Sequence, residues 1–235
     1  MRTAVVIGAG PGLGAAVARR FAREGFAVAV VARQEQTLAP IVEQITAAGG
    51  QARAFAADTT KAAAVTALFA AVRTAFGPPD VLVYNASAFQ MGGVMELSPE
   101  DFERCWQVGC LGAFLCAREV LPAMIERRSG TVLFTGATAA LRGSARFSAL
   151  AVGKFGLRAL AQSMARELHP QGIHVAHIVI DGQIASDRAR KMSPGRDEAT
   201  MLAPDAIADT YWHLHSQPAT AWTHELELRP ATEKF

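Results

Sequence analysis

The chain alternates short apolar runs with longer segments in which apolar residues recur at helical spacing. Seven runs have the length of β-strands and end at turn residues or polar segments. They span residues 3–8, 27–32, 52–57, 80–85, 130–136, 174–180 and 224–228. The first six runs are almost wholly apolar, as strands are when both faces of a sheet are covered. The pattern therefore predicts a sheet that is buried on both sides.

The segments between these runs have the periodicity of amphipathic helices. They span residues 12–24, 36–48, 60–76, 99–127, 147–168 and 204–216. Ser98 followed by Pro99 is typical of a helix start, and Gly172 after a His-Pro pair is typical of a helix end. Alternating strands and helices imply right-handed crossovers. We therefore predict an α/β fold, a doubly wound parallel sheet of seven strands with helices on both faces.

No linker, repeat or low-complexity tract divides the chain, so residues 1–235 are expected to form a single domain. One segment, 182–203, is charged, contains Pro194 and Gly195, and has no clear helix or strand pattern. Long irregular segments inside compact domains often cover a substrate. We therefore predict that residues 182–203 form a substrate-lid loop.

Composition and charge narrow the possible classes of function. Of the 235 residues, 51% are hydrophobic and 19% are charged, which favours a compact globular protein over a disordered one. A net charge of +2 without a run of Lys or Arg argues against a nucleic-acid partner. The N-terminus does not read as a secretion signal, and no apolar run reaches the roughly 20 residues of a membrane helix. With three cysteines in no disulfide or CxxC spacing, we expect a cytoplasmic protein without a membrane partner.

A glycine-rich turn follows the first predicted strand and opens the first predicted helix. Its glycines, Gly8, Gly12 and Gly14, have the spacing G-x-x-x-G-x-G. A phosphate group requires backbone N–H donors at a helix N-terminus without a Cβ in the way, and such a turn provides them. At the start of a strand–helix–strand unit, this turn predicts a dinucleotide-binding site.

The chain resembles the short-chain dehydrogenase/reductase family along nearly its whole length. The glycine turn matches the family pattern, Asp58 after the third strand matches its adenine-contacting aspartate, and Asn85 in "YNAS" matches the Asn of its N-A-G motif. The resemblance implies a Rossmann-type fold, a nicotinamide cofactor, a small-molecule substrate, and a homodimer or homotetramer built on two long helices. It also implies a set of cofactor-binding positions: Gly8, Gly12, Leu13, Gly14, Asp58, Thr59, Asn85, Ala86, Lys154, Gly182 and Ile184.

The end of the second strand favours NADP(H) over NAD(H). Enzymes that use NAD usually place an acidic residue there to bind the ribose 2′-hydroxyl. Here Ala32 takes that position and Arg33 follows it. A guanidinium is a permanent, fork-shaped donor that suits a 2′-phosphate. We therefore add Arg33 to the predicted cofactor site.

The resemblance also implies a catalytic tyrosine, a lysine four residues later, an orienting serine and an asparagine that supports a water relay. Lys154 matches the family lysine without a gap. The tyrosine position is then Leu150, the serine position Ala137 and the asparagine position Gly109. None of these three side chains can donate a proton. Lys154 is expected to keep its second family role, which is to hydrogen-bond the nicotinamide ribose.

Other polar residues near these positions are weaker candidates for the missing acid. Thr138 lies next to the serine position, Ser148 two residues before the tyrosine position, and Ser87 and Cys110 on segments expected to face the nicotinamide. Each also fits a structural role, as a cap, a bond to the helix backbone or a core thiol.

A metal-dependent site is not expected. His213 and His215 lie two residues apart, so they fall on different helical faces and lack the spacing of metal ligands.

Two hypotheses follow from the sequence. The first is an NADP(H)-dependent oxidoreductase with non-standard proton chemistry that transfers hydride to or from a small organic substrate. One family branch, the 2,4-dienoyl-CoA reductases, is similar in keeping the lysine without the tyrosine, which makes an activated C=C one possible substrate. The second hypothesis is a catalytically silent NADP(H)-binding sensor or partner protein. The cofactor site alone does not discriminate between the two, because both require it.

Overall fold

The computed structural model describes residues 1–233, apart from the side chains of Arg188 and Met192. At its centre is one seven-stranded sheet in the order β3-β2-β1-β4-β5-β6-β7, in which each neighbouring pair is parallel. The strands are β1 (Thr3–Ile7), β2 (Ala27–Ala32), β3 (Gln51–Ala56), β4 (Val81–Tyr84), β5 (Gly130–Thr135), β6 (Ile173–Ile180) and β7 (Glu225–Leu228). The predicted seven-stranded parallel sheet is confirmed.

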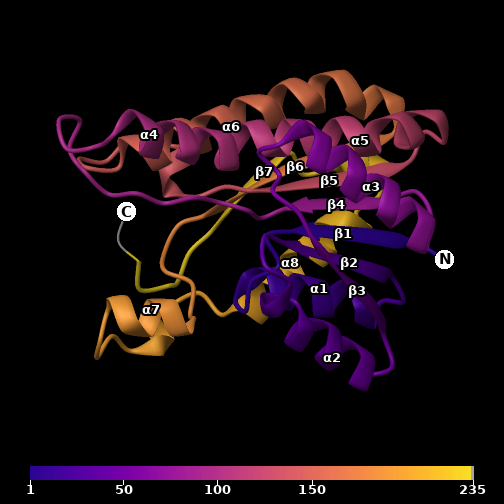
Figure 1. Cartoon of the computed structure of the whole chain (residues 1–235), viewed down its shortest axis with the longest axis horizontal. Coiled ribbons are helices and arrows are strands. Elements are labelled where there is room, and N and C mark those ends of the chain that lie inside the picture. Colours follow the sequence, from indigo (N-terminus) through magenta and orange to yellow (C-terminus); the bar gives the residue numbers. More distant parts are fainter. Residues whose placement is uncertain (234–235) are drawn as a thin grey trace.

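Helices cover both faces of this sheet (Figure 1). The helices are α1 (Leu13–Arg23), α2 (Ala39–Ala47), α3 (Ala62–Phe76), α4 (Pro99–Trp106), α5 (Gly112–Glu126), α6 (Ser148–Leu168), α7 (Asp187–Met192) and α8 (Pro204–Ser216). In Figure 1 the layer of α3, α4, α5 and α6 lies above the sheet, and α1, α2 and α8 lie below it. The short helix α7 stands outside both layers, at the carboxyl ends of the strands.

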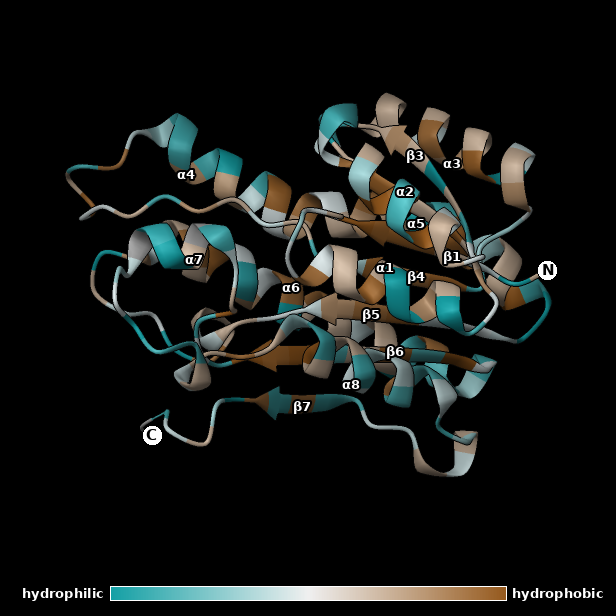
Figure 2. Cartoon of the chain, turned by 90° about the horizontal axis from the view of Figure 1, so that it is seen from below, coloured by the Kyte–Doolittle hydropathy of each residue, from teal (hydrophilic) through white to brown (hydrophobic). Residues whose placement is uncertain are grey.

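The alternation of side chains along β1 shows how the core is divided. Ala4 and Val6 pack into the cluster beneath α1, α2 and α8, whereas Val5 and Ile7 pack into the cluster beneath α3, α5 and α6. All four side chains are almost fully buried. A strand buried on both faces is apolar at every position, which explains the continuous apolar runs in the sequence. In Figure 2 the strands of the sheet are mainly brown, whereas most of the helices mix teal and brown residues.

Two predicted elements differ from the structure. The helix predicted over 99–127 is divided into α4 and α5 by one wider turn, Gln107–Leu111, with π-helical hydrogen bonding. The segment 182–203 is not a plain loop, because it contains α7 and a single 3₁₀ turn at Glu198–Thr200.

By length and composition alone, the helical stretch Pro99–Glu126 is long and apolar enough to cross a membrane. Core helices of globular proteins pass the same test, so this is weak evidence for a membrane span.

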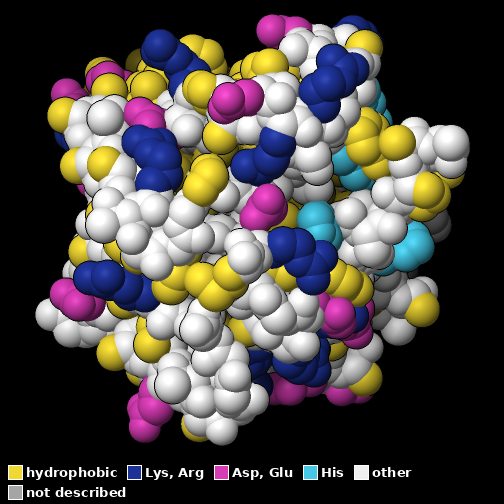
Figure 3. Space-filling view, turned by 90° about the vertical axis from the view of Figure 1, so that its right-hand side faces the viewer, with side chains coloured by type: hydrophobic (Ala, Val, Ile, Leu, Met, Phe, Trp, Pro, Cys, Tyr) yellow, Lys and Arg dark blue, Asp and Glu magenta, His cyan; other side chains and the backbone are white. Residues whose placement is uncertain are grey.

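Charged side chains are mixed on the face formed by the amino ends of the strands. Figure 3 shows Lys and Arg side chains interspersed with Asp, Glu and apolar side chains over this face. The cavities described below lie at the opposite end of the sheet.

Candidate functional site

A long cleft runs along the carboxyl ends of the strands and consists of two adjoining hollows. The larger hollow has a volume of about 770 Å³ and the smaller one about 510 Å³. Asn85, Ser87 and Phe89 line both hollows, so they lie where the two meet. The strand order reverses between β1 and β4, and ligands of doubly wound sheets bind in the crevice at that point.

The glycine turn forms the floor of the cleft where the backbone of α1 begins. Gly8 has a φ of +81°, and a Cβ built on it would lie 2.6 Å from the backbone nitrogen of Ala86. A Cβ on Gly14 would lie 2.3 Å from the carbonyl oxygen of Gly8. Only glycine fits at either position without moving the backbone. The amide of Asn85 donates to the same Gly8 oxygen at 2.9 Å, which ties β4 to the turn.

The N-terminus of α1 is open towards the larger hollow. Gly12 is its N-cap residue, no side chain caps it, and its first turn has no acidic residue. Gly12 and Leu13 line the larger hollow. The free N–H groups and the positive end of the helix dipole are therefore available to an anionic group such as a diphosphate.

The predicted adenosine-binding residues meet at the smaller hollow, which Arg33, Asp58, Thr59 and Ala86 line. Asp58 Oδ1 accepts from the backbone N–H and the hydroxyl of Thr60, at 3.0 and 2.8 Å. Burial opposes ionisation of Asp58, but these hydrogen bonds, followed by the charges of Lys61 and Arg33, outweigh it and lower the pKa of the carboxyl. Asp58 is thus a fixed carboxylate acceptor, and Arg33 supplies an exposed positive charge beside it.

Lys154 lies on the sheet side of the larger hollow and is 4% exposed. Its Nζ donates to the carbonyl oxygen of Thr135 at 2.7 Å. Burial lowers the pKa of Lys154 to about 8. Leu150, one helical turn earlier, and Ala137 line the same hollow. The positions matched to the family lysine, tyrosine and serine therefore come together in space.

Gly109 lies in the π-helical turn and is enclosed by backbone. A Cβ at Gly109 would lie 3.3 Å from the Cα of Gly153, and a Cβ at Gly153 would lie 2.9 Å from the carbonyl oxygen of Cys105. The chain from α4 to α5 therefore approaches α6 through glycines on both sides. Any side chain at position 109 would require the two segments to move apart by a few tenths of an ångström.

The weaker candidates for an acid lie outside the lining of the larger hollow, with the exception of Ser87. The hydroxyl of Thr138 donates to the carboxylate of Asp181, so its proton is already in use. Cys110 packs beneath Gly156, where a Cβ would lie 3.0 Å from its Sγ. Ser148 is the first residue of α6. In the described part of the chain, no group of three or more His, Cys, Asp or Glu could hold a metal ion.

Several residues of the cleft were not predicted from the sequence, and the three with polar side chains in the segment 182–203 are Ser186, Asp187 and Arg190. Ser186, Asp187 and Arg190 line the larger hollow together with the predicted Gly182 and Ile184. Ser186 caps α7 by accepting from the backbone N–H of Ala189 at 3.1 Å. A serine followed by an acidic residue is a helix-start signal that could have located α7.

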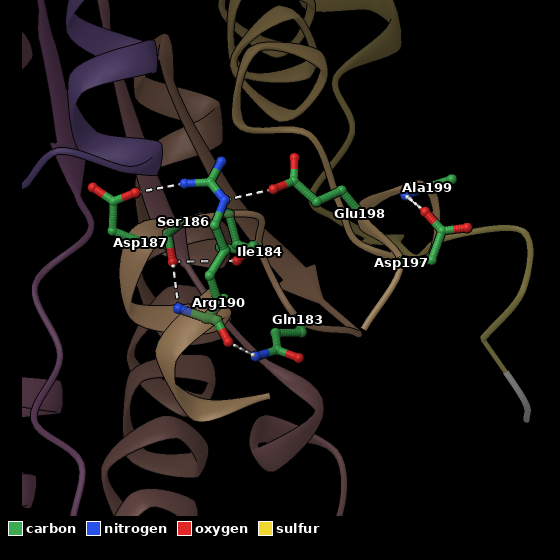
Figure 4. A network of polar contacts seen from close by, with 9 residues as sticks. Gln183, Ile184, Ser186, Asp187, Arg190, Asp197, Glu198 and Ala199 are labelled. Atoms are coloured by element: carbon green, nitrogen blue, oxygen red, sulfur yellow. Dashed lines mark hydrogen bonds and ion pairs between the residues drawn. The ribbon is translucent and has the colours of Figure 1, made fainter. Parts of the chain in front are cut away.

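Ion pairs join side chains within α7 and link α7 to the 3₁₀ turn that follows it. The Arg190 guanidinium donates to the carboxylates of both Asp187 and Glu198, as Figure 4 shows. All three side chains are more than half exposed. Exposed ion pairs contribute little stability, typically about 0–1 kcal/mol each. The segment is closed mainly by backbone hydrogen bonds, from Ala185 to the carbonyl of Leu202 and from Leu202 to the carbonyl of Gln183, both at 2.9 Å.

A buried histidine lies behind the floor of the larger hollow. Nε2 of His177 lies against Gly136, where a Cβ would come within 2.4 Å. On the other side of the ring, Nδ1 is 2.9 Å from Glu225, which also accepts two hydrogen bonds from Arg158 at 2.7 and 2.8 Å. Burial lowers the pKa of His177 to about 4, and Arg158 lowers that of Glu225. At neutral pH, therefore, a neutral imidazole donates from Nδ1 to a carboxylate.

This arrangement predicts that the fold loses stability in mild acid. The pKa of His177 is about 4 in the folded chain and near 6.5 without burial. Between these two values the unfolded chain binds a proton that the folded chain does not, so the free energy of unfolding falls as the pH drops from 6.5 to 4. The loss from His177 approaches about 3 kcal/mol. Urea unfolding at several pH values measures it, and His177→Gln should flatten the dependence; an unchanged slope in that variant would rule out His177 as the cause.

Comparison with known proteins agrees with this geometry. The family model for short chain dehydrogenases matches residues 2–197. Sorbitol-6-phosphate 2-dehydrogenase of Escherichia coli is 33% identical over 213 residues, which cover 89% of this chain and 82% of that protein. The crystal structure of a short-chain dehydrogenase from Rhodopseudomonas palustris is 41% identical, with a TM-score of 0.84, over 97% of this chain and 98% of that one.

A metagenomic short-chain oxidoreductase crystallised in complex with NADP is 31% identical, with a TM-score of 0.85, over 98% of this chain and 97% of that one. Fold, glycine turn and whole-chain similarity thus agree: the chain belongs to the short-chain dehydrogenase family of nicotinamide-dependent oxidoreductases.

Proposed function

We propose that this protein is an NADP(H)-dependent oxidoreductase that transfers hydride to or from a small organic substrate without a catalytic tyrosine. The observation that carries the proposal is the cleft, in which an uncapped helix N-terminus, Asp58 and Lys154 lie along one line of cavities. A bound nicotinamide cofactor supplies the hydride. The protein's own residues bind the cofactor, orient the substrate and move the proton.

The residues present fit a dinucleotide. Gly12 and Leu13 line the larger hollow, no side chain caps the N-terminus of α1, and the N–H groups of Leu13 and Gly14 would bind the diphosphate. Asp58 is a fixed acceptor for the adenine amino group. Lys154 would donate to the hydroxyls of the nicotinamide ribose. Gly182 and Ile184 would bound the nicotinamide from the opposite side of the larger hollow.

Preference for NADP(H) rests on the end of β2. Ala32 and Arg33 both line the smaller hollow, so a positive charge stands where NAD enzymes place a carboxylate. Two similar structures support the proposal: the metagenomic oxidoreductase was crystallised with NADP, and an actinorhodin polyketide ketoreductase that is 26% identical was crystallised with NADPH.

The substrate side of the larger hollow is mainly apolar. Its lining includes Phe89, Ala137, Leu150, Ile180 and Ile184. Such a surface binds the carbon skeleton of a substrate and offers few polar contacts. We therefore propose an electrophile that needs little help from an acid, such as a conjugated C=C, an iminium or an activated carbonyl.

A second candidate function is a catalytically silent NADP(H)-binding sensor or partner protein. The observation in its favour is the apolar character of Leu150, Ala137 and Gly109, which provide no hydroxyl or amide at the three family positions. The ordered segment 182–203 over the hollow favours the enzyme instead, because a silent fold has little use for a substrate lid.

Transfer of deuterium decides between the two functions. NADPH deuterated at C4 is incubated with the protein and trans-cinnamaldehyde, which carries both a conjugated C=C and an aldehyde. Mass spectrometry of the product shows whether deuterium reached the alkene carbon, the carbonyl carbon or neither. We expect deuterium in the product. Binding of NADPH without transfer to this probe or to iminium and quinone probes would support the silent protein.

We further expect a homodimer or homotetramer in the cytoplasm. The outer faces of α4, α5 and α6 expose large apolar side chains, among them Trp106, Phe114, Val152 and Phe155 at 39–42% exposure. A neighbouring copy that covered them would remove this apolar surface from water. Light scattering at micromolar concentration should therefore give a multiple of 24.9 kDa. A mass equal to one chain would contradict the prediction, and Phe155→Glu should shift a dimer towards monomer.

A further inference from the structure

We propose that the amino group of Lys154 is itself the proton donor and acceptor of the reaction, rather than an assistant to another acid. The inference rests on the proposed function and names the group that carries out its proton step.

The lining of the larger hollow leaves few alternatives. Among the described residues that line it, Lys154, Asp187 and Arg190 have ionisable side chains. Asp187 and Arg190 are exposed, paired with each other and located on α7. Lys154 is buried on the sheet side, beside Ala137 and Leu150. Of these three residues, Lys154 is therefore the one beside the positions that match the family's catalytic tyrosine and serine.

The hydrogen bonding of Lys154 leaves its amine available. Nζ donates one bond, to the Thr135 carbonyl, and an ammonium has three hydrogens to donate. No ion pair joins Lys154 to any residue that the structure describes. Leu150 has no polar atom that could donate a proton to the substrate. A tyrosine at this position would be the proton donor instead of Lys154.

The surroundings explain why this amine can exchange a proton near neutral pH. Segments packed on α6 bring four ionisable groups to the neighbourhood of Lys154: Cys105 on α4, Cys110 on the π-helical turn, His177 on β6 and Asp181 directly after β6. Burial raises the pKa of both thiols and lowers that of His177, so these three groups are neutral. Asp181 is bound by Thr138 and Arg229. Burial is thus uncompensated and lowers the pKa of Lys154 to about 8, close to the pH at which a general acid is most effective.

The proton step balances without another reactant. When hydride adds to a carbonyl carbon, the electron pair of the C=O π bond moves to oxygen and forms an alkoxide. When hydride adds to a conjugated C=C, the same displacement of electrons forms an enolate. The developing anion takes a proton from Nζ: one N–H bond breaks, one O–H or C–H bond forms, and Lys154 becomes a neutral amine. The amine recovers its proton from solvent. In the oxidative direction the neutral amine accepts the hydroxyl proton, so reduction slows and oxidation accelerates as the pH rises through about 8.

Titration of Lys154 tests the inference without any substrate. The sequence has four lysines, so protein labelled with ε-¹³C-lysine gives a short list of signals in a heteronuclear NMR spectrum. The signal that disappears in Lys154→Arg belongs to Lys154. We expect that signal to titrate near pH 8, as the burial predicts. A midpoint above pH 10 would overturn the inference, because the amine would then be too weak an acid.

Two substitutions separate proton transfer from positioning. Lys154→Arg keeps a positive donor but cannot lose its proton, whereas Lys154→Met removes both properties. With trans-cinnamaldehyde and NADPH, we expect Lys154→Arg to bind NADPH within about threefold of the parent but to turn over about 100-fold more slowly, without the parent's dependence on pH. Lys154→Met should lose affinity as well.

The two possible failures are distinguishable. If Lys154→Arg keeps most of the parent's turnover, Lys154 only positions the cofactor, and the inference fails while the proposed function stands. If the parent binds NADPH and reduces no probe, the proposed function itself fails.

Discussion

The Arg33→Asp variant is expected to bind NADH more tightly than NADPH, whereas the parent should bind NADPH at least tenfold more tightly. Arg33 is the positive side chain at the end of β2 that lines the smaller hollow, and Ala32 beside it has no charge. A carboxylate at this position repels a 2′-phosphate and accepts from a 2′-hydroxyl. The change from one preference to the other amounts to about 1.4 kcal/mol for each factor of ten. Calorimetric titration with both cofactors measures it.

A matched control for this variant is Arg53→Asp. Arg53 is exposed on the neighbouring strand β3 and lies outside both hollows of the cleft. Its substitution by Asp changes the net charge by the same amount as Arg33→Asp but leaves the cofactor site unchanged. Its cofactor preference should equal that of the parent. Equal affinities of the parent for the two cofactors would remove the argument for NADP(H).

The double variant Leu150→Tyr with Ala137→Ser is expected to gain weak activity on simple ketones. Both side chains line the larger hollow, and Leu150 precedes the buried Lys154 by one helical turn. A phenol beside that ammonium should have a lowered pKa and could donate a proton. A well-placed general acid contributes about 10²–10⁴-fold, and we expect the lower end because Gly109 provides no amide for a water relay. Reduction of cyclohexanone by NADPH is the assay.

Leu150→Phe with Ala137→Ser is the control, because it has the same ring without the hydroxyl. If the tyrosine variant reduces the ketone and the phenylalanine variant does not, the scaffold for ketone reduction is intact and lacks only the tyrosine hydroxyl. If neither variant does so although both bind NADPH, the substrate pocket has diverged, and carbonyl reduction should be abandoned as the reaction.

The fold could be predicted closely because its signals are local. Strands buried on both faces must be apolar throughout, and the glycine turn must follow a strand and open a helix. The division of 99–127 into two helices had no such signal. The wide turn lies where Gly109 approaches Gly153, a residue 44 positions away in the sequence. Only packing of the folded chain brings them together.

In the site, too, local motifs could be predicted from the sequence, whereas contacts between distant residues could not. Gly12, Asn85, Lys154 and Gly182 were predicted from motif positions, and all four line the cleft. The partners that decide how other side chains behave are distant in the sequence. Thr138 donates to a carboxylate 43 residues away, which no local pattern indicates.

His177 on β6, the strand next to the edge strand β7, shows the same limit. In the structure its Nδ1 bonds Glu225, 48 residues on, but its Nε2 has no partner among the described residues.

A crystal structure with bound NADP⁺ tests the central claim most directly, namely that one cleft holds a whole dinucleotide with its nicotinamide beside Lys154. The account predicts a cofactor that spans both hollows, with the diphosphate at the N-terminus of α1, the 2′-phosphate beside Arg33, and the nicotinamide in the larger hollow between Lys154 and Gly182. A cofactor held only by its adenosine half, with the nicotinamide outside the larger hollow, would contradict it.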